Sequence, residues 1–389
     1  MNIIKLCKDS KFKIKSFNFA KLLEKIKYFH PKYIIKDYII AFKQGKLLET
    51  IKSQLFFLLN KLAKKKTIDG FPEGLLGVSI NNDKIVLVHL VNNDDKNFVI
   101  KSKGIFEFNI TDFDFQDLEQ NEKIQNIISN YIQNNNLLQI RAAYVLSNQQ
   151  YVISLIELPS VADLDNSKEK AILLGIKDYL NYPLDDAMLD SFEIPVNRSS
   201  DNIKLAYSVA MQAKLSQNIG KLLAKSNIHL KYIDISELCI RNIVSLYPEI
   251  KEVGCLVLKI FDNNNSILLM KNKDVYICRN TTLDINQLDN FDPVVDNMPE
   301  KIAIANNLLS ELQRSLDYAN NMFRTVNFNT ICVLPSGCNL EKTICWLKEQ
   351  SGLPVYNLDL HKILGFSDMP LKEQANWLLA IGAALRNID

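Results

Sequence analysis

The sequence predicts a two-lobed α/β fold preceded by a basic helical extension at the N-terminus. Two observations point to the lobes. Each half of the region after residue 70 opens with two short β-branched segments around an Asn-rich turn, and each pair is followed by alternating helix and strand patterns. A third observation sets the extension apart, because residues 1–70 have helical spacing and many lysines. The 389 residues, 47% of them hydrophobic, suffice for one large two-lobed core.

The N-terminal extension carries the positive charge of the chain. Residues 1–70 hold 17 Lys, no Arg and 5 acidic residues, a net charge of +12, whereas the rest of the chain has a net charge of −10. A basic extension on an acidic body predicts an anionic surface as partner, either a membrane or a nucleic acid. The absence of Arg disfavours nucleic acid, because bidentate contacts to phosphates and bases favour Arg. We therefore expect no nucleic acid, and a nucleic-acid-binding extension is kept as the second alternative function.

The end of the extension, residues 51–66, has the pattern of an interfacial amphipathic helix, with an apolar run followed by three lysines. Its apolar run is far shorter than the roughly 20 residues that a membrane-spanning helix needs. The side chains expected to contact an anionic membrane surface are Phe56, Phe57, Lys64, Lys65 and Lys66. The alternative is a lysine-rich helix that packs on its own body or on a partner protein.

The seven cysteines and four histidines predict free thiols and no metal site. No Cys-x-x-Cys pair occurs in the sequence, and structural zinc sites need such closely spaced ligands. We expect a reducing compartment, because the first residues lack the continuous apolar core and the small-residue cleavage site of a signal peptide.

The first lobe is predicted to begin with a hairpin in residues 75–90, LLGVSINNDKIVLVHL. Asn81, Asn82 and Asp83 form its turn, between strands at 75–80 and 84–90. The pattern then predicts strands at 97–101 and 104–110, a helix at 118–133, strands at 141–147 and 151–157, a helix at 168–180, a strand at 203–210, a helix at 213–226 and a strand at 230–234.

The second lobe repeats this order. Another hairpin joins strands at 253–261 and 266–270 through a turn of one Asp and three Asn. The pattern continues with a strand at 274–279, a helix at 301–323, a strand at 330–334, a turn at 335–337, a helix at 340–350, a strand at 355–358 and a helix at 373–386. We interpret the repetition as two related α/β lobes.

Several stretches, in this order, resemble the family of actin-like cytoplasmic proteins of type IV pilus assembly, PilM and its MshI relative of the mannose-sensitive pilus. Residues 176–186, IKDYLNYPLDD, resemble the family's segment ending in FPLEE, and Tyr232-Ile233-Asp234 precedes a helix as it does there. Residues 311–318, ELQRSLDY, are similar to EIRRSLDFY, and residues 380–386, AIGAALR, to AIGLALR. The resemblance covers roughly residues 75–389 and implies the fold of the actin/hexokinase superfamily.

On this resemblance the chain divides into four parts. The basic extension is followed by two actin-like lobes, and a last helix returns to the first lobe. The expected limits are 1–70 for the basic amphipathic helical extension, 71–235 for the first lobe with an inserted subdomain at about 141–200, 236–364 for the second lobe and 365–389 for the C-terminal helix.

The resemblance also implies a nucleotide site between the lobes, but residues that such a site needs are replaced here. Glycine lets backbone N–H groups approach phosphate oxygens, and aspartate organises Mg²⁺ and its waters. Where the family has Asp-Ile-Gly in its first loop, this chain has Ser79 and Asn81. In the second loop it has Lys259 and Phe261. The family's Gly-Gly-Gly unit on the adenosine side has become Pro335-Ser336-Gly337.

These replacements predict a pseudo-ATPase with no catalytic residue and no bound cofactor. The resemblance then implies a non-catalytic cytoplasmic scaffold, peripheral to the inner membrane, in a type IV pilus or secretion platform. Its partner would be a bitopic membrane protein similar to PilN or MshJ, and we expect Tyr182, Pro183 and Leu184 to contact the partner's cytoplasmic N-terminal segment. The first alternative is a nucleotide-dependent switch that binds ATP and Mg²⁺ weakly. Assembly into a homo-oligomer is left open.

Overall fold

The computed structural model describes residues 72–81, 83–94, 97–108, 115, 117–158, 167–195, 203–260, 265–365 and 369–386. All of these residues belong to one compact unit. The predicted amphipathic extension, with Phe56, Phe57 and Lys64 to Lys66, lies outside the described residues, and so does Phe261.

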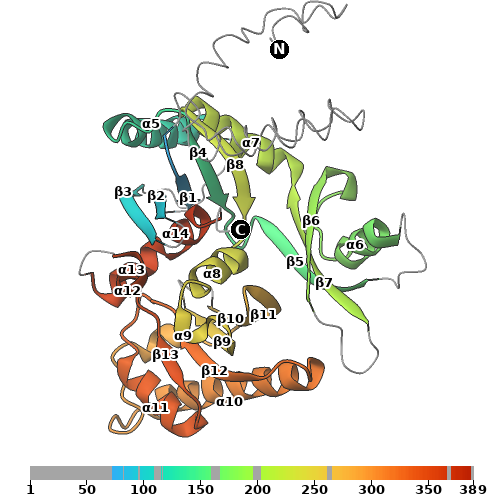
Figure 1. Cartoon of the computed structure of the whole chain (residues 1–389), viewed down its shortest axis with the longest axis vertical. Coiled ribbons are helices and arrows are strands. Elements are labelled where there is room, and N and C mark those ends of the chain that lie inside the picture. The colour runs from blue at the N-terminus through green and yellow to red at the C-terminus, as the bar shows by residue number, and fades with distance from the viewer. Residues whose placement is uncertain are drawn as a thin grey trace, which may run out of the picture. The chain divides into compact units, whose positions relative to one another are not determined.

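Two five-stranded sheets with the same strand order form the framework (Figure 1). The first has the order β3-β2-β1-β4-β8 and the second β11-β10-β9-β12-β13. In each sheet, the first three strands of this order are antiparallel to their neighbours. The last two strands run parallel to the central strand, which is β1 in the first sheet and β9 in the second. The first sheet contains β1 (Leu75–Ile80), β2 (Lys84–Asp94), β3 (Asn97–Glu107), β4 (Ile140–Val145) and β8 (Ile228–Asp234). The second contains β9 (Gly254–Lys259), β10 (Asn265–Lys271), β11 (Asp274–Thr281), β12 (Phe328–Val333) and β13 (Val355–Asn357). The predicted repetition of a hairpin followed by helix–strand alternation is confirmed.

Helices cover both sheets, so that layers of helix and sheet alternate (Figure 1). Helices α5 (Leu118–Asn134) and α7 (Ala213–Lys225) pack on the outer face of the first sheet. Helices α10 (Pro299–Met322) and α11 (Glu341–Ser351) pack on the outer face of the second. Between the sheets lie α8 (Ser236–Val244) and α14 (Leu378–Ala384), in one apolar cluster with side chains of both sheets. The short elements are η2 (Leu184–Asp186), α9 (Pro248–Lys251), η3 (Ile285–Leu288), α12 (His361–Leu364), α13 (Leu371–Gln374) and η4 (Ala375–Trp377).

The first strand is buried on both faces, because helices cover both sides of its sheet. Leu76, Val78 and Ile80 face the core under α5 and α7. On the opposite face, a Cβ atom added at Gly77 would lie 1.8 Å from the Ala380 carbonyl oxygen of α14. Only glycine therefore allows the backbones of β1 and α14 to approach this closely.

A third sheet interrupts the first lobe between β4 and β8. Its order is β5-β7-β6, all antiparallel, from β5 (Tyr151–Leu158), β6 (Ala187–Glu193) and β7 (Lys204–Gln212). Helix α6 (Ser167–Lys177) covers one face, where Gly175 lies against Ile156. The strands of this insert lie between Tyr151 and Gln212, later in the chain than the expected range of about 141–200. The difference arises because β4, at the start of that range, pairs with β1 and β8.

Two elements differ from the sequence prediction. A single strand, β3, replaces the two strands predicted at 97–101 and 104–110, because β3 pairs with β2 along its length and continues through Gly104. The helix predicted at 373–386 is divided into α13, η4 and α14.

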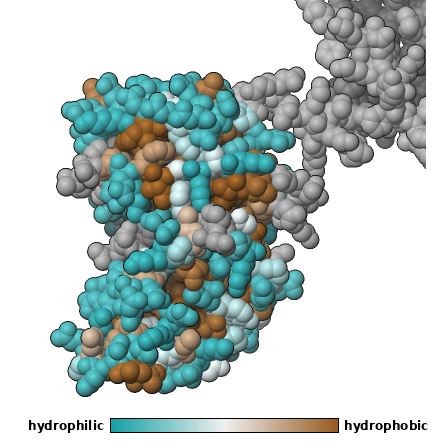
Figure 2. All heavy atoms as spheres, turned by 90° about the vertical axis from the view of Figure 1, so that its left-hand side faces the viewer, coloured by the Kyte–Doolittle hydropathy of each residue, from teal (hydrophilic) through white to brown (hydrophobic). Residues whose placement is uncertain are grey.

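Within the described ranges, no helix is both long enough and apolar enough to cross a membrane. The surface of one face is mostly hydrophilic, with hydrophobic groups gathered in separate patches (Figure 2).

Two glycine substitutions test the packing of β1 on α14. Gly77→Ala should lower the free energy of unfolding by about 3 kcal/mol or more, since its methyl group overlaps the backbone of α14. Gly220→Ala in α7 is the matched control, because nothing lies within 4 Å of a Cβ atom there. It should raise the free energy of unfolding by about 0.5–1 kcal/mol through helix propensity. Urea unfolding measures both, and a tolerated Gly77→Ala would contradict the close contact.

Candidate functional site

The predicted nucleotide-loop residues of the first lobe lie at the carboxyl edge of its sheet. Ser79 is buried near the end of β1 and is in register with Val145 of β4, which pairs with Asp234 at the end of β8. Asn81 is half-buried, and its N–H donates to the Lys84 carbonyl oxygen over 3.0 Å, which closes the hairpin turn. Open α/β sheets bind ligands at this edge.

Asp234 is the buried carboxylate at this edge, and both of its oxygens have partners within the chain. Oδ1 accepts from the N–H of Ile235 over 2.9 Å, and Oδ2 pairs with Nη1 of Arg386 at 2.9 Å. Burial raises the pKa of Asp234, and the Arg386 guanidinium opposes that shift. Two of the stretches that carry the family resemblance, residues 232–234 and 380–386, therefore meet in one part-buried ion pair.

The second lobe places its predicted residues at the equivalent edge. Lys259 ends β9 and is 2% exposed. The Ser336 hydroxyl donates to the Cys338 carbonyl oxygen over 2.9 Å and accepts a longer hydrogen bond, of 3.4 Å, from the N–H of the same residue. Gly337 is exposed, with open space around the position of a Cβ atom. The turn at residues 335–337 is thus stabilised by its own hydrogen bonds.

The Lys259 side chain places a basic group in the buried junction between the lobes. Burial lowers the pKa of Lys259, and the nearby carboxylate of Glu237 acts in the opposite direction. Glu237 is itself buried, at the start of α8. The charged lysine therefore costs free energy in the folded protein, and Glu237 offsets part of that cost.

Glu237 also connects the junction to the third sheet. Its Oε2 accepts a hydrogen bond of 2.7 Å from the hydroxyl of Tyr151, which lies 3.2 Å from the Ser236 hydroxyl. Burial raises the pKa of Tyr151 well above its usual value, and the negative charge of Glu237 adds to the shift. Residues of β5, α8 and β9 thus form one buried polar cluster, which we call the junction cluster: Tyr151, Ser236, Glu237 and Lys259.

The predicted partner-binding residues lie elsewhere, between α6 and β6. Tyr182 is half-buried and its hydroxyl has no hydrogen-bond partner in the described residues. Burial raises the pKa of Tyr182. Pro183 is exposed and Leu184 is half-buried at the start of η2. The structure therefore does not bring this segment into the junction cluster.

The sequence reasoning missed Tyr151, Ser236 and Glu237, and it did not pair Asp234 with Arg386. One signal was available for the carboxylates. Asp234 ends a strand and Glu237 lies in the first turn of the helix that follows, where side chains reach the ligand edge of an α/β sheet. Throughout the described segments, no group of three or more His, Cys, Asp or Glu side chains is placed to hold a metal ion.

Replacing the buried lysine should stabilise the protein. Lys259→Met keeps most of the side-chain volume and removes the ammonium group, so we expect the free energy of unfolding at pH 7 to rise by about 1 kcal/mol. The pKa of Lys259 in the folded protein lies below its usual value of 10.5, so the folded wild type loses this proton at a lower pH than the unfolded wild type. The free-energy cost of burying the charge therefore decreases as pH rises toward 10.5, and the difference in stability between the two proteins should shrink.

Urea unfolding at several pH values measures this difference. Lys348→Met on the exposed face of α11 is the matched control and should change stability by less than about 0.5 kcal/mol. A loss of stability in Lys259→Met would mean that the attraction of Glu237 exceeds the cost of burial.

Comparison of the sequence and of the structure with known proteins identifies the fold. No protein-family model matches the sequence, and no curated protein does. A chain of the PilM-PilN type IV pilus biogenesis complex is 17% identical, with a TM-score of 0.60 over 81% of this chain and 99% of that one. A Bacteroides thetaiotaomicron protein with an actin-like ATPase fold and unknown function is 8% identical, with a TM-score of 0.43 over 80% and 98%.

A third structure is the cytoplasmic domain of EpsL, an inner membrane component of the type II secretion system of Vibrio cholerae. It is 11% identical, with a TM-score of 0.39 over 78% of this chain and 94% of that one. The fold follows from the superposition on the pilus protein, which covers almost all of that chain, and from the duplicated strand order of the two sheets. This chain has the two-lobed actin-like α/β fold.

Proposed function

We propose that this protein is a non-catalytic scaffold of a type IV pilus or secretion platform, in the manner of PilM and MshI. The observation that carries the non-catalytic part is the buried ammonium of Lys259. It stands where the second phosphate loop needs an acid to organise Mg²⁺, and it faces Glu237 within the junction cluster. Ser79 and Asn81, at the equivalent loop of the first lobe, supply neither a carboxylate nor a glycine.

The fold supports the platform part of the proposal, since it is shared with a chain of a PilM-PilN complex. We place the protein in the cytoplasm, at the inner membrane, with a bitopic PilN-like or MshJ-like protein as partner. The partner's short cytoplasmic segment would contact Tyr182, Pro183 and Leu184 beside α6. The lysine-rich residues 1–70 would add attraction to anionic lipids, on the order of 1 kcal/mol for each lysine near the surface.

Thermal unfolding with nucleotide tests the scaffold against the ATP-dependent switch. We expect the midpoint of unfolding to change by less than about 1 °C at about 5 mM Mg-ATP, because a ligand raises the midpoint only when it binds the folded state. Mg²⁺ without nucleotide is the control. A rise that grows with the Mg-ATP concentration would favour the switch and refute the non-catalytic proposal.

Affinity capture from detergent-solubilised membranes tests the partner. The full-length chain should retain a membrane protein with a single span and a cytoplasmic N-terminus, and Leu184→Asp should retain less of it, because a charge in an apolar contact opposes binding. Met188→Asp is the matched control, since Met188 is 48% exposed on β6, just beyond the proposed segment. Equal capture by both variants, or capture of no such protein, would refute this contact.

A further inference from the structure

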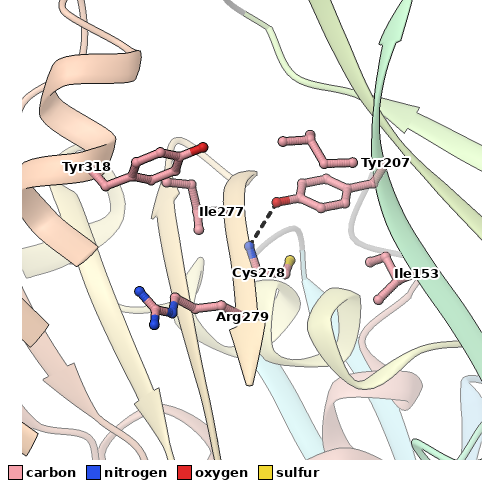
Figure 3. Close-up of a pocket in the computed structure, with 7 residues that line it drawn as sticks. Ile153, Tyr207, Ile277, Cys278, Arg279 and Tyr318 are labelled. Carbon is pink, nitrogen blue, oxygen red and sulfur yellow. Dashed lines mark hydrogen bonds between the residues drawn. The ribbon is translucent and has the colours of Figure 1, made fainter. Parts of the chain in front are cut away.

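A pocket of about 330 Å³ opens between the third sheet and the second lobe (Figure 3). One wall comes from β5 and β7 and the other from β11 and α10. Its main lining side chains are Ile153, Tyr207, Ile277, Cys278, Arg279 and Tyr318. The volume is at the lower end of the range for ligand pockets, and the lining has their usual mixture of many apolar groups and a few polar ones.

The floor of the pocket is preformed by the Tyr207 hydroxyl. It accepts a hydrogen bond of 2.9 Å from the N–H of Cys278 and lies 3.4 Å from the Tyr276 carbonyl oxygen as a donor (Figure 3). Burial raises the pKa of Tyr207 well above its usual value, so the hydroxyl keeps its proton at neutral pH. The pocket therefore exists before any ligand binds, and a ligand pays little to organise it.

Arg279 gives the pocket a positive charge at a fixed position. Its Nη1 donates to the Ser315 hydroxyl over 3.2 Å, and that hydroxyl donates to the Glu311 carbonyl oxygen over 2.6 Å. Arg279 is exposed, and no carboxylate within the described part of the chain forms an ion pair with it. A guanidinium anchored in this way is prepared to bind an external carboxylate.

The strand beside the pocket favours an extended ligand. Among the strands that the structure describes, β5 pairs with β7 only, so its other edge presents backbone groups to an incoming strand. Ile153 and Leu155 point from β5 into the pocket, whereas Ile156 points to the opposite face, where Gly175 of α6 covers it. The pocket and helix α6 therefore lie on opposite faces of the third sheet.

We propose that this pocket binds an extended segment of a partner protein that carries a large apolar side chain next to an acidic residue. The apolar side chain lies against Ile153 and Tyr207, and the carboxylate pairs with Arg279. Bound there, the segment contacts the third sheet and the second lobe at once. This is a second docking site, because none of its lining residues belongs to the Tyr182–Leu184 segment assigned above to the membrane partner, and it does not depend on that assignment.

Fluorescence anisotropy with two labelled pentapeptides and the full-length chain tests the proposal. The first peptide has a Leu-Glu pair between serines, and the second has Leu-Lys in its place. We expect saturable binding of the Leu-Glu peptide and at least about tenfold weaker binding of the Leu-Lys peptide, because charge complementarity sets the preference. No saturable binding below about 1 mM, or equal binding of both peptides, would overturn the proposal.

Two charge-removing variants locate the binding. Arg279→Gln should weaken the Leu-Glu peptide by about tenfold and abolish the preference between the peptides. Lys348→Gln removes one exposed positive charge from α11, a helix that contributes no lining residue, and should leave the affinity unchanged. Leu155→Asp should weaken both peptides, because it places a negative charge on the apolar wall of the pocket. Equal effects of Arg279→Gln and Lys348→Gln would place the binding elsewhere and overturn the proposal.

Discussion

The contact between β1 and α14 is the constraint on which the rest of the structure depends. It joins the first strand of the described fold to its last helix, through Gly77 and the backbone of Ala380. A second close approach follows on the same helix, where a Cβ atom at Gly382 would lie 2.4 Å from the Cys239 carbonyl oxygen of α8. The Asn242 side chain adds a hydrogen bond of 2.9 Å to the Gly382 carbonyl oxygen. These contacts fix the helical layer against which both sheets pack, and they bring Arg386 to Asp234.

The junction contains two buried carboxylates and two cations that neutralise each other inside one chain. Asp234 has Arg386 as its partner, and Glu237 has the longer-range attraction of Lys259. In actin-like ATPases a metal ion and phosphates supply the mobile charges at such a junction. Here covalently attached side chains supply charges of both signs. We propose that they take over this electrostatic role, which is the physical argument behind the proposed scaffold.

More of the fold than of the candidate site could be predicted from the sequence. Period-two patterns and Asn-rich turns identified the hairpins of both lobes, because a hairpin is defined by neighbouring residues. Sheet membership was less accessible: β4 belongs to the first sheet and not to the insert, because its partners β1 and β8 lie far away in sequence. The ion pair of Asp234 and Arg386 spans 152 positions, and no local pattern encodes it. The burial of Lys259 was likewise hidden, since lysine is almost always exposed.

The hydroxyl of Tyr207 has a consequence for self-association. Strand β11 is the last strand of its sheet, and an uncovered edge strand is a template for pairing with another molecule, which leads to aggregation. Tyr207 occupies the N–H of Cys278 and the carbonyl of Tyr276, two groups that such a molecule would use. The third sheet thus covers the edge strand of the second lobe. A movement that separates the two would expose the unpaired backbone groups of β11 to other molecules. The contact between them therefore opposes aggregation and also forms the pocket.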